Sequence, residues 1–159
     1  EGTDELNLRV SERDVTFEMG NTRVTTRLIE GQFPNYRSLI PQAHPNKLTV
    51  DRAALIETVR RVKVVVRDAS TPVRLLMKPD GLELSVTSQD YGTSFEQLDA
   101  KFEGTELAVA FNPQYLIEGA TAAGGEEVTI ETIDNLKPAL LVSTENPAYR
   151  YVLMPVRFP

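Results

Sequence analysis

The sequence predicts an α+β fold of two β-α-β-β-β units, with two helices packed on antiparallel sheet and a separate three-strand piece in front. A strand followed by a capped helix occurs twice, at residues 47–66 and 107–122. Each of these pairs is followed by three more strand-like segments. Residues 47–158 therefore carry one pattern repeated, and residues 5–29 resemble the last three strands of another copy.

Length and composition limit the kinds of protein that this chain can be. The chain has 159 residues, room for about one domain or slightly more, and a hydrophobic fraction of 41% can form a substantial core. The net charge of −6 argues against a protein that binds nucleic acid through an overall positive charge. Without cysteine or a long apolar run, we expect a soluble intracellular protein with no disulfide and no membrane contact. The chain does not begin with Met and starts almost at once in a strand-like pattern, so we expect either a fragment or a processed form of a protein.

The first part of the chain alternates apolar and polar residues over positions 5–29, which predicts three short antiparallel strands. A stretch with three prolines follows and is expected to be a linker. We place the boundaries at 1–35 for an incomplete first domain, 36–46 for the linker, and 47–159 for a complete second domain.

The first repeat begins with a strand at 47–50 and continues into a helix. Asp51 is a good N-cap for a helix that runs from Arg52 to about Val66. The β-branched residues at the end of this helix weaken it. Strands are then expected at 73–77, 82–87 and 92–98.

The second repeat begins with a strand at 107–111. Asn112 caps a helix with Pro113 at its first position, and a glycine pair ends it near Ala122. Strands at 128–132, 138–142 and 149–154 complete the repeat.

Catalytic chemistry is not visible in the sequence. The single histidine, His44, lies in the proline-rich linker and is expected to be a solvated loop residue. Asp80 and Asp90 are typical of turns, and no glycine-rich phosphate-binding motif occurs. We therefore expect no catalytic residue, no metal and no cofactor, and an enzyme is the least favoured class.

A basic stripe runs along one face of the first helix, about a quarter turn from its apolar stripe. Its members are Arg52, Arg60, Lys63 and Arg67. On an acidic chain these cations suit sequence-independent contact with phosphates. The alternative is an ordinary solvated helix face.

Two proline-bounded apolar stretches, at 31–41 and 149–159, lie outside the periodic elements. We expect them to lie side by side and to form a cleft for a partner's apolar side chains, because exposed apolar surface marks an interface. Methionine suits a site that accepts several partners. The alternative is that the two stretches pack the linker onto the domain.

Four motifs carry a resemblance to a known family. They are Phe33-Pro34-Asn35-Tyr36-Arg37 with Leu39-Ile40-Pro41, then Phe111-Asn112-Pro113 with Tyr115-Leu116, Leu136-Lys137-Pro138-Ala139, and Met154-Pro155-Val156-Arg157-Phe158. In this order they resemble the C-terminal part of the bacterial sliding clamp, the beta subunit of DNA polymerase III. The resemblance covers essentially the whole chain, with 1–35 matching the end of the middle clamp domain and 47–159 the C-terminal clamp domain.

The resemblance implies a DNA polymerase processivity factor of the DNA-clamp fold. Two three-domain subunits form a homodimeric ring around duplex DNA, with helices lining the hole, so the basic stripe becomes a DNA-facing candidate. The ring recruits the replicative polymerase subunit, the clamp loader, repair polymerases, and ligase or mismatch-repair proteins through short linear motifs. The alternative is a stand-alone β-rich interaction or regulatory module that uses the same domain.

The resemblance also assigns site residues. Pro34, Leu39, Val152 and Met154 match the apolar subsite of the partner-peptide groove. The adjoining positions are Asn112, Tyr115, Leu136, Pro138, Pro155, Val156 and Arg157. Ser38 stands where some members have arginine, and Phe158 replaces the usual leucine. Another segment of the family's subsite is absent, so we expect an incomplete pocket.

The subunit interface is implied at the end of the basic helix. Val64 and Val65 match positions where the third domain packs on the first domain of the other subunit. The strand at 92–98 is expected to be the exposed edge that pairs across this interface, since unpaired edges are adhesive.

Overall fold

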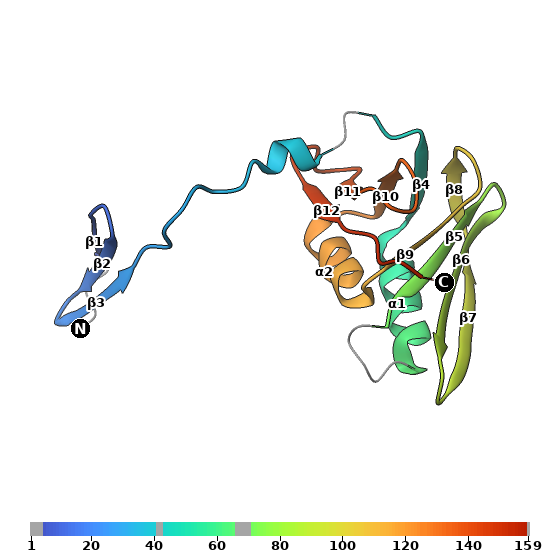
Figure 1. Cartoon of the computed structure of the whole chain (residues 1–159), viewed down its shortest axis with the longest axis horizontal. Coiled ribbons are helices and arrows are strands. Elements are labelled where there is room, and N and C mark those ends of the chain that lie inside the picture. The colour runs from blue at the N-terminus through green and yellow to red at the C-terminus, as the bar shows by residue number, and fades with distance from the viewer. Residues whose placement is uncertain (1–4, 41–42, 66–70, 159) are drawn as a thin grey trace. The chain divides into compact units, whose positions relative to one another are not determined.

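The computed structural model describes residues 5–40, 43–65 and 71–158, and the chain divides into two compact units, Glu1–Asn35 and Tyr36–Pro159 (Figure 1). The first unit is an antiparallel sheet of β1 (Asn7–Val10), β2 (Asp14–Met19) and β3 (Thr22–Arg27), in that order. The three predicted strands are thus confirmed. None of the described residues of this unit is buried, so the sheet has no apolar core of its own.

The second unit contains two antiparallel sheets. One has the strand order β12-β11-β10-β4-β8 and the other the order β7-β6-β5-β9. The bounds in the first sheet are β4 (Asn46–Asp51), β8 (Ala100–Glu103), β10 (Glu127–Thr132), β11 (Ala139–Ser143) and β12 (Arg150–Leu153). Those in the second are β5 (Val73–Lys78), β6 (Gly81–Ser88), β7 (Gly92–Leu98) and β9 (Leu107–Phe111). A short 3-10 helix, η1 (Tyr36–Leu39), precedes both sheets.

The two repeats exchange their first strands. Strand β4 opens the first repeat but pairs with β10 of the second, and β9 opens the second repeat but pairs with β5 of the first. Each sheet therefore contains strands from both repeats, which joins them into one body. The predicted pair of β-α-β-β-β units is confirmed, with one strand added.

The added strand is β8, which the sequence pattern does not predict. Strand β7 pairs with β6, whereas β8 pairs with β4 in the other sheet, and only Asp99 lies between them. The extended segment 92–103 thus leaves one sheet and joins the other. With apolar residues only at Ala100 and Phe102, β8 is too short for periodicity to reveal it.

The first helix is shorter than predicted. Helix α1 (Arg52–Val62) begins as expected, because the Asp51 side chain accepts a hydrogen bond of 2.7 Å from the Ala54 backbone N–H. It ends at Val62 rather than near Val66, and the 3-10 helix η2 (Lys63–Val65) follows. Stiff β-branched side chains at this end account for the early termination. Val66 lies outside the described residues.

The apolar core lies between the sheets and the two helices. Helix α2 (Pro113–Ala123) packs against α1, and the two lie side by side in Figure 1. The largest fully buried side chains come from both repeats and include Phe111, Leu48, Leu55, Leu75, Leu116 and Ile130. Every buried apolar side chain of the described residues lies between positions 48 and 153. The second unit therefore folds around its own core.

Candidate functional site

The five residues that follow β12 form an extended segment, which we call the C-terminal arm (residues 154–158). Leu153 is buried, but Met154 is 61% exposed, so the chain leaves the core at this point. The Val156 N–H donates a hydrogen bond of 2.8 Å to the carbonyl oxygen of Ala110, in β9. This bond fixes the middle of the arm to the second sheet, although the arm itself is not a strand.

A hollow opens beside the arm. It has a volume of about 180 Å³ and is lined by Asn135, Leu136, Val156, Arg157 and Phe158. Three of the residues predicted for the partner groove, Leu136, Val156 and Arg157, are therefore brought together from two distant segments of the sequence. Phe158 also lines this hollow; it belongs to the terminal stretch expected to form the cleft, but it is not among the individual groove residues that the resemblance assigns.

The turn before β11 holds Leu136 in position. The Asp134 carboxylate accepts hydrogen bonds of 2.8 Å from the backbone N–H groups of Leu136 and Lys137. These bonds hold the pKa of Asp134 below its ordinary value, because they favour the charged carboxylate. Leu136 itself is 60% exposed, so an apolar side chain is presented to solvent by a turn that is fixed by charge-assisted bonds.

Helix α2 contributes the other predicted polar and aromatic positions. The Asn112 side chain caps the helix, as expected, by accepting hydrogen bonds from the N–H groups of Gln114 and Tyr115. Tyr115 is 56% exposed. The side chain of Asn112 is thus used to start the helix that presents Tyr115.

Strand β12 packs tightly against α2. The Tyr149 hydroxyl donates a hydrogen bond of 2.7 Å to the Gly119 carbonyl oxygen. A Cβ atom at Gly119 would lie 2.6 Å from the Tyr151 ring. Burial raises the pKa of both tyrosine hydroxyls above the ordinary value, since it disfavours the phenolate. This contact joins the strand that precedes the arm to the helix that carries Tyr115.

The remaining groove candidates do not line the hollow beside the C-terminal arm. Val152, Pro138 and Pro155 are half-buried in the second unit. Pro34 is exposed and belongs to the first unit. Leu39 lies in η1, and its side chain is outside the described residues. Their membership of the apolar subsite stays a prediction.

The basic stripe of α1 is partly engaged within the unit. Arg52 is half-buried and its Nε donates a bond of 2.6 Å to the Gly125 carbonyl oxygen. Arg60 pairs with Glu57 at 2.8 Å, and Lys63 Nζ donates to the side-chain oxygen of Gln114 in α2 at 3.2 Å.

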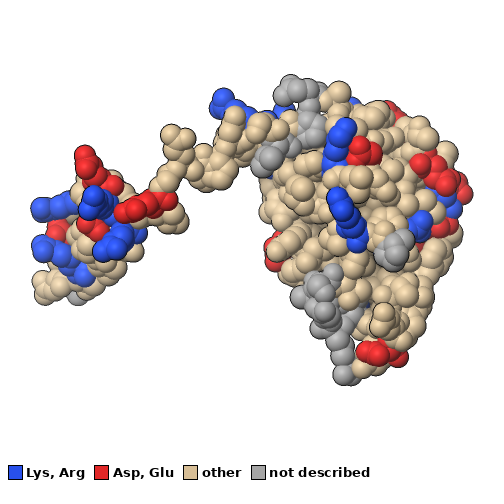
Figure 2. Space-filling model, viewed as in Figure 1, with Lys and Arg blue, Asp and Glu red and all other residues tan. Residues whose placement is uncertain are grey.

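Arg67, the fourth member of the stripe, lies outside the described residues. On the face of the second unit in view in Figure 2, Lys and Arg side chains stand apart in a largely uncharged surface. The DNA-facing role of the stripe stays a prediction.

The expected interface residues differ in burial. Val64 is 80% exposed, whereas Val65 is half-buried and packs against the core. Strand β7 is an edge of its sheet, as predicted. The Arg61 guanidinium bonds both oxygens of Glu96 in β7, which ties this edge to α1 and holds the pKa of Glu96 below its ordinary value.

The expectation for His44 was wrong. Its side chain is only 6% exposed, and its Nδ1 lies 3.2 Å from a carboxylate oxygen of Glu131 in β10. The Nε2 atom is buried and has no hydrogen-bond partner. Because Glu131 is far away in the sequence, nothing local to the linker indicates that His44 docks on the first sheet.

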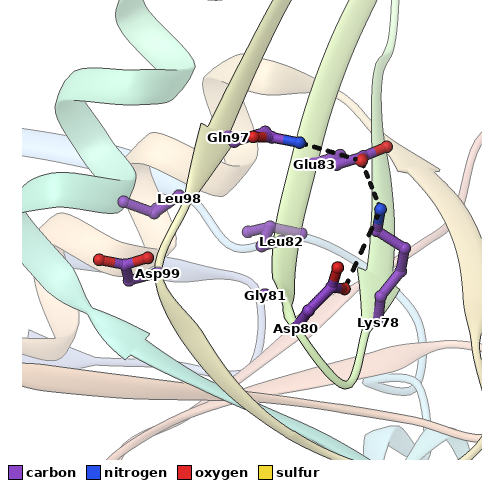
Figure 3. Close-up of a pocket in the computed structure, with 8 residues that line it drawn as sticks. All are labelled: Lys78, Asp80, Gly81, Leu82, Glu83, Gln97, Leu98 and Asp99. Carbon is purple, nitrogen blue, oxygen red and sulfur yellow. Dashed lines mark hydrogen bonds and ion pairs between the residues drawn. The ribbon is translucent and has the colours of Figure 1, made fainter.

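A second hollow contains none of the predicted residues. It has a volume of about 110 Å³ and lies at the turn between β5 and β6 (Figure 3). The Lys78 ammonium points to Glu83 and to Asp80, and the Gln97 amide also donates to Glu83 at 3.2 Å. The ion pair raises the pKa of Lys78 and lowers that of Glu83. The charges of Lys78, Asp80 and Glu83 are therefore balanced by one another.

Among the residues that the structure describes, no group of three or more His, Cys, Asp or Glu side chains is arranged to hold a metal ion. None of the helices in this described part of the chain has the length and apolar character that crossing a bilayer requires.

Comparison with known proteins identifies relatives. The profile of the "DNA polymerase III beta subunit, C-terminal domain" matches residues 37–157. The chain is 36% identical over 149 residues to the beta sliding clamp of Streptomyces coelicolor, covering 90% of this chain and 39% of that protein. It is 30% identical over 152 residues to the beta sliding clamp of Caulobacter vibrioides, covering 96% of this chain and 41% of that protein.

Solved structures agree with these relatives. The sliding clamp of Bartonella birtlesii, determined with bound griselimycin, matches with a TM-score of 0.87 and 32% identity, over 96% of this chain and 41% of that chain. The chain spans about two fifths of the length of these relatives. The profile match covers most of the chain, and the fold agrees with it, so this chain belongs to the family of the DNA polymerase III beta subunit, the bacterial sliding clamp.

Proposed function

We propose that this chain is the C-terminal part of a DNA polymerase processivity factor. In this proposal the whole protein forms a homodimeric ring that encircles duplex DNA in the cytoplasm, slides along it, and recruits partners through a peptide groove. The ring has no catalytic residues and needs no cofactor, because its task is to hold other proteins on DNA. Family membership supports this role, and the hollow beside the C-terminal arm carries it at the level of residues.

The groove is proposed for short apolar partner motifs. Three large side chains around this part of the unit, Met154, Leu136 and Tyr115, are each more than half exposed. Exposed apolar side chains that a folded unit has not buried mark an interaction surface. Met154 adds a flexible, polarisable side chain that can adapt to the different partners of a clamp.

Sequence-independent contact with DNA is proposed for the basic stripe. Arg60 lies on the exposed face of α1 and Lys63 follows it at the start of η2, and α1 contains no aromatic residue that could stack on bases. Phosphate contacts position a protein on DNA without reading sequence, which suits a ring that must slide. The partner subunit is proposed to pack at Val64 and at the β7 edge.

The peptide groove can be tested with a labelled peptide that contains the sequence Gln-Leu-x-Leu-Phe. We expect weak but saturable binding, and we expect Met154→Ala to weaken it about tenfold, the loss of about 1.4 kcal/mol of apolar contact. Met19→Ala is the matched control, because Met19 is similarly exposed, 54% against 61% for Met154, but lies in the first unit. Isothermal titration calorimetry gives both affinities. Equal loss in the two variants, or none in either, would reject the groove assignment.

A further inference from the structure

Two contacts attach the C-terminal arm to a single rung of the second sheet. The Val156 N–H donates to the carbonyl oxygen of Ala110 at 2.8 Å, and the Arg74 guanidinium carbon lies 5.7 Å from the centre of the Phe158 ring. Arg74 in β5 and Ala110 in β9 are direct partners in the ladder between these strands. The arm is therefore attached at two points, Val156 and Phe158, to one pair of residues that face each other across the β5–β9 ladder.

Phe158 lines two hollows. One is the hollow of about 180 Å³ that it shares with Leu136, Val156 and Arg157. The other has a volume of about 400 Å³ and lies on the second sheet, where Phe158 lines it together with Arg74, Ser85, Thr87 and Ala110 among others. Arg74 lines the second hollow and not the first, so it lies over the Phe158 ring without lining the candidate groove.

Within the described part of the chain, no carboxylate lies close enough to the Arg74 guanidinium to form an ion pair with it, although the charge of Arg74 contributes to lowering the pKa of Glu83. The guanidinium carbon of Arg74 lies over the Phe158 ring. A cation over an aromatic face is attracted by the negative charge of the ring's π-electrons. Phe158 is half-buried, so this attraction acts on a ring that already packs against the sheet.

We propose that Arg74 and Phe158 form a clasp that positions Val156 and Arg157 in the partner groove. This inference rests on the proposed function, since it assigns positioning residues to that groove. Arg74 is a positioning residue and does not contact the bound peptide. Apart from the Val156 bond the arm makes no ladder, so without the clasp it would sample other conformations, and binding would have to restore the lost order.

The test compares Arg74→Ala with Arg74→Lys, Phe158→Ala and the double variant, all in the 159-residue chain. Lys101→Ala, which removes one cation from the exposed surface of β8, is the control for charge. Peptide affinity is measured by fluorescence anisotropy with the Gln-Leu-x-Leu-Phe peptide. Hydrogen exchange of the Val156 amide reports the attachment of the arm, and thermal unfolding reports the stability of the whole unit.

We expect Arg74→Ala to weaken peptide binding about two- to fivefold and to speed exchange at the Val156 amide by a similar factor. Arg74→Lys, which keeps a cation, should recover most of both effects. The melting temperature and the exchange of core amides should stay unchanged. The double variant should bind no more weakly than Phe158→Ala alone, because the two side chains act as one unit.

Two results would overturn the clasp. One is an unchanged Val156 exchange rate in Arg74→Ala. The other is an additive loss of affinity in the double variant, which would mean that Phe158 and Arg74 act independently. If the unchanged chain fails to bind any peptide, the proposed function fails, while the Val156 exchange rates still decide whether the clasp exists.

Discussion

At the scale of single residues, Gly119 decides how closely β12 approaches α2. Glycine is normally unfavourable inside a helix, by about 1 kcal/mol relative to alanine. Here its missing side chain leaves the space that the Tyr151 ring occupies, and its carbonyl oxygen accepts the Tyr149 hydroxyl. The strand that leads into the C-terminal arm is therefore aligned by a residue that has no side chain.

Gly119→Ala should consequently destabilise the unit although it improves helix propensity. The new Cβ would lie 2.6 Å from the Tyr151 ring, and overpacking of this kind costs about 1–3 kcal/mol. Thr121→Ala, at an exposed position of the same helix, is the control and should be neutral or slightly stabilising. Urea denaturation followed by circular dichroism measures both. Equal stability of Gly119→Ala and the unchanged protein would contradict the tight packing.

At the scale of elements, the turn before β11 connects a buried strand to the exposed side chain of Leu136. Asp134 bonds two backbone N–H groups, so the turn is closed locally before β11 begins at Ala139. Asp residues favour such turns because their short side chains reach the backbone two or three residues later. The orientation of Leu136 is thus determined mainly within four residues.

Asp134→Ala should loosen this turn, with a loss of about 1 kcal/mol in the free energy of unfolding. Asp134→Asn keeps an acceptor oxygen and should lose less. Since the folded-state pKa of Asp134 is lowered, its charge contributes stability above its unfolded-state pKa, and this contribution is lost as the pH falls through the lower folded value. At pH 7 the unchanged protein should have a higher free energy of unfolding than Asp134→Asn. Denaturation at about pH 3 should show a smaller difference between the two. An advantage that is independent of pH would contradict the charge-assisted bonds.

At the scale of the whole molecule, the two units differ in how they are stabilised. The second unit contains all of the buried apolar side chains in the described residues. In the first unit, large apolar residues such as Leu8, Val10 and Val24 are more than half exposed. A small sheet without a packed face is at best marginally stable in water.

Removal of residues 1–35 should therefore leave residues 36–159 folded, with a melting temperature within about 3 °C of that of the whole chain. In the intact chain, amides of β1 to β3 should exchange much faster than those of β5 and β10. Differential scanning calorimetry and hydrogen exchange measure these two quantities. Loss of cooperative unfolding after the deletion would show that the second unit depends on the first.

Local signals in the sequence were sufficient for the helices and most strands. Asp51 and Asn112 cap their helices through bonds to residues only two or three positions away, so their roles are visible in short windows. Strand β8 and the burial of His44 were missed because each depends on a partner far along the chain, β4 and Glu131 respectively. Periodicity contains no information about such pairings.

The groove was predicted from motifs rather than from local chemistry. These motifs named Leu136, Val156 and Arg157, and the fold brings them to one hollow. They did not identify Arg74, whose only signal is a cation that interrupts the apolar residues of β5. Its contact with Phe158 follows from the exchange of strands between the repeats, which sets β5 beside β9.

The strand that changes sheets at Asp99 also has a mechanical consequence. Because β7 and β8 are joined by a single residue, tension applied along the β7 edge passes directly into β8 and then into β4. This force is shared by the backbone hydrogen bonds of the β6–β7 and β4–β8 ladders. Because the force acts along the strands, these hydrogen bonds are loaded in shear, all at the same time. An edge built in this way withstands pulling along its length better than a terminal strand that can be peeled off one bond at a time.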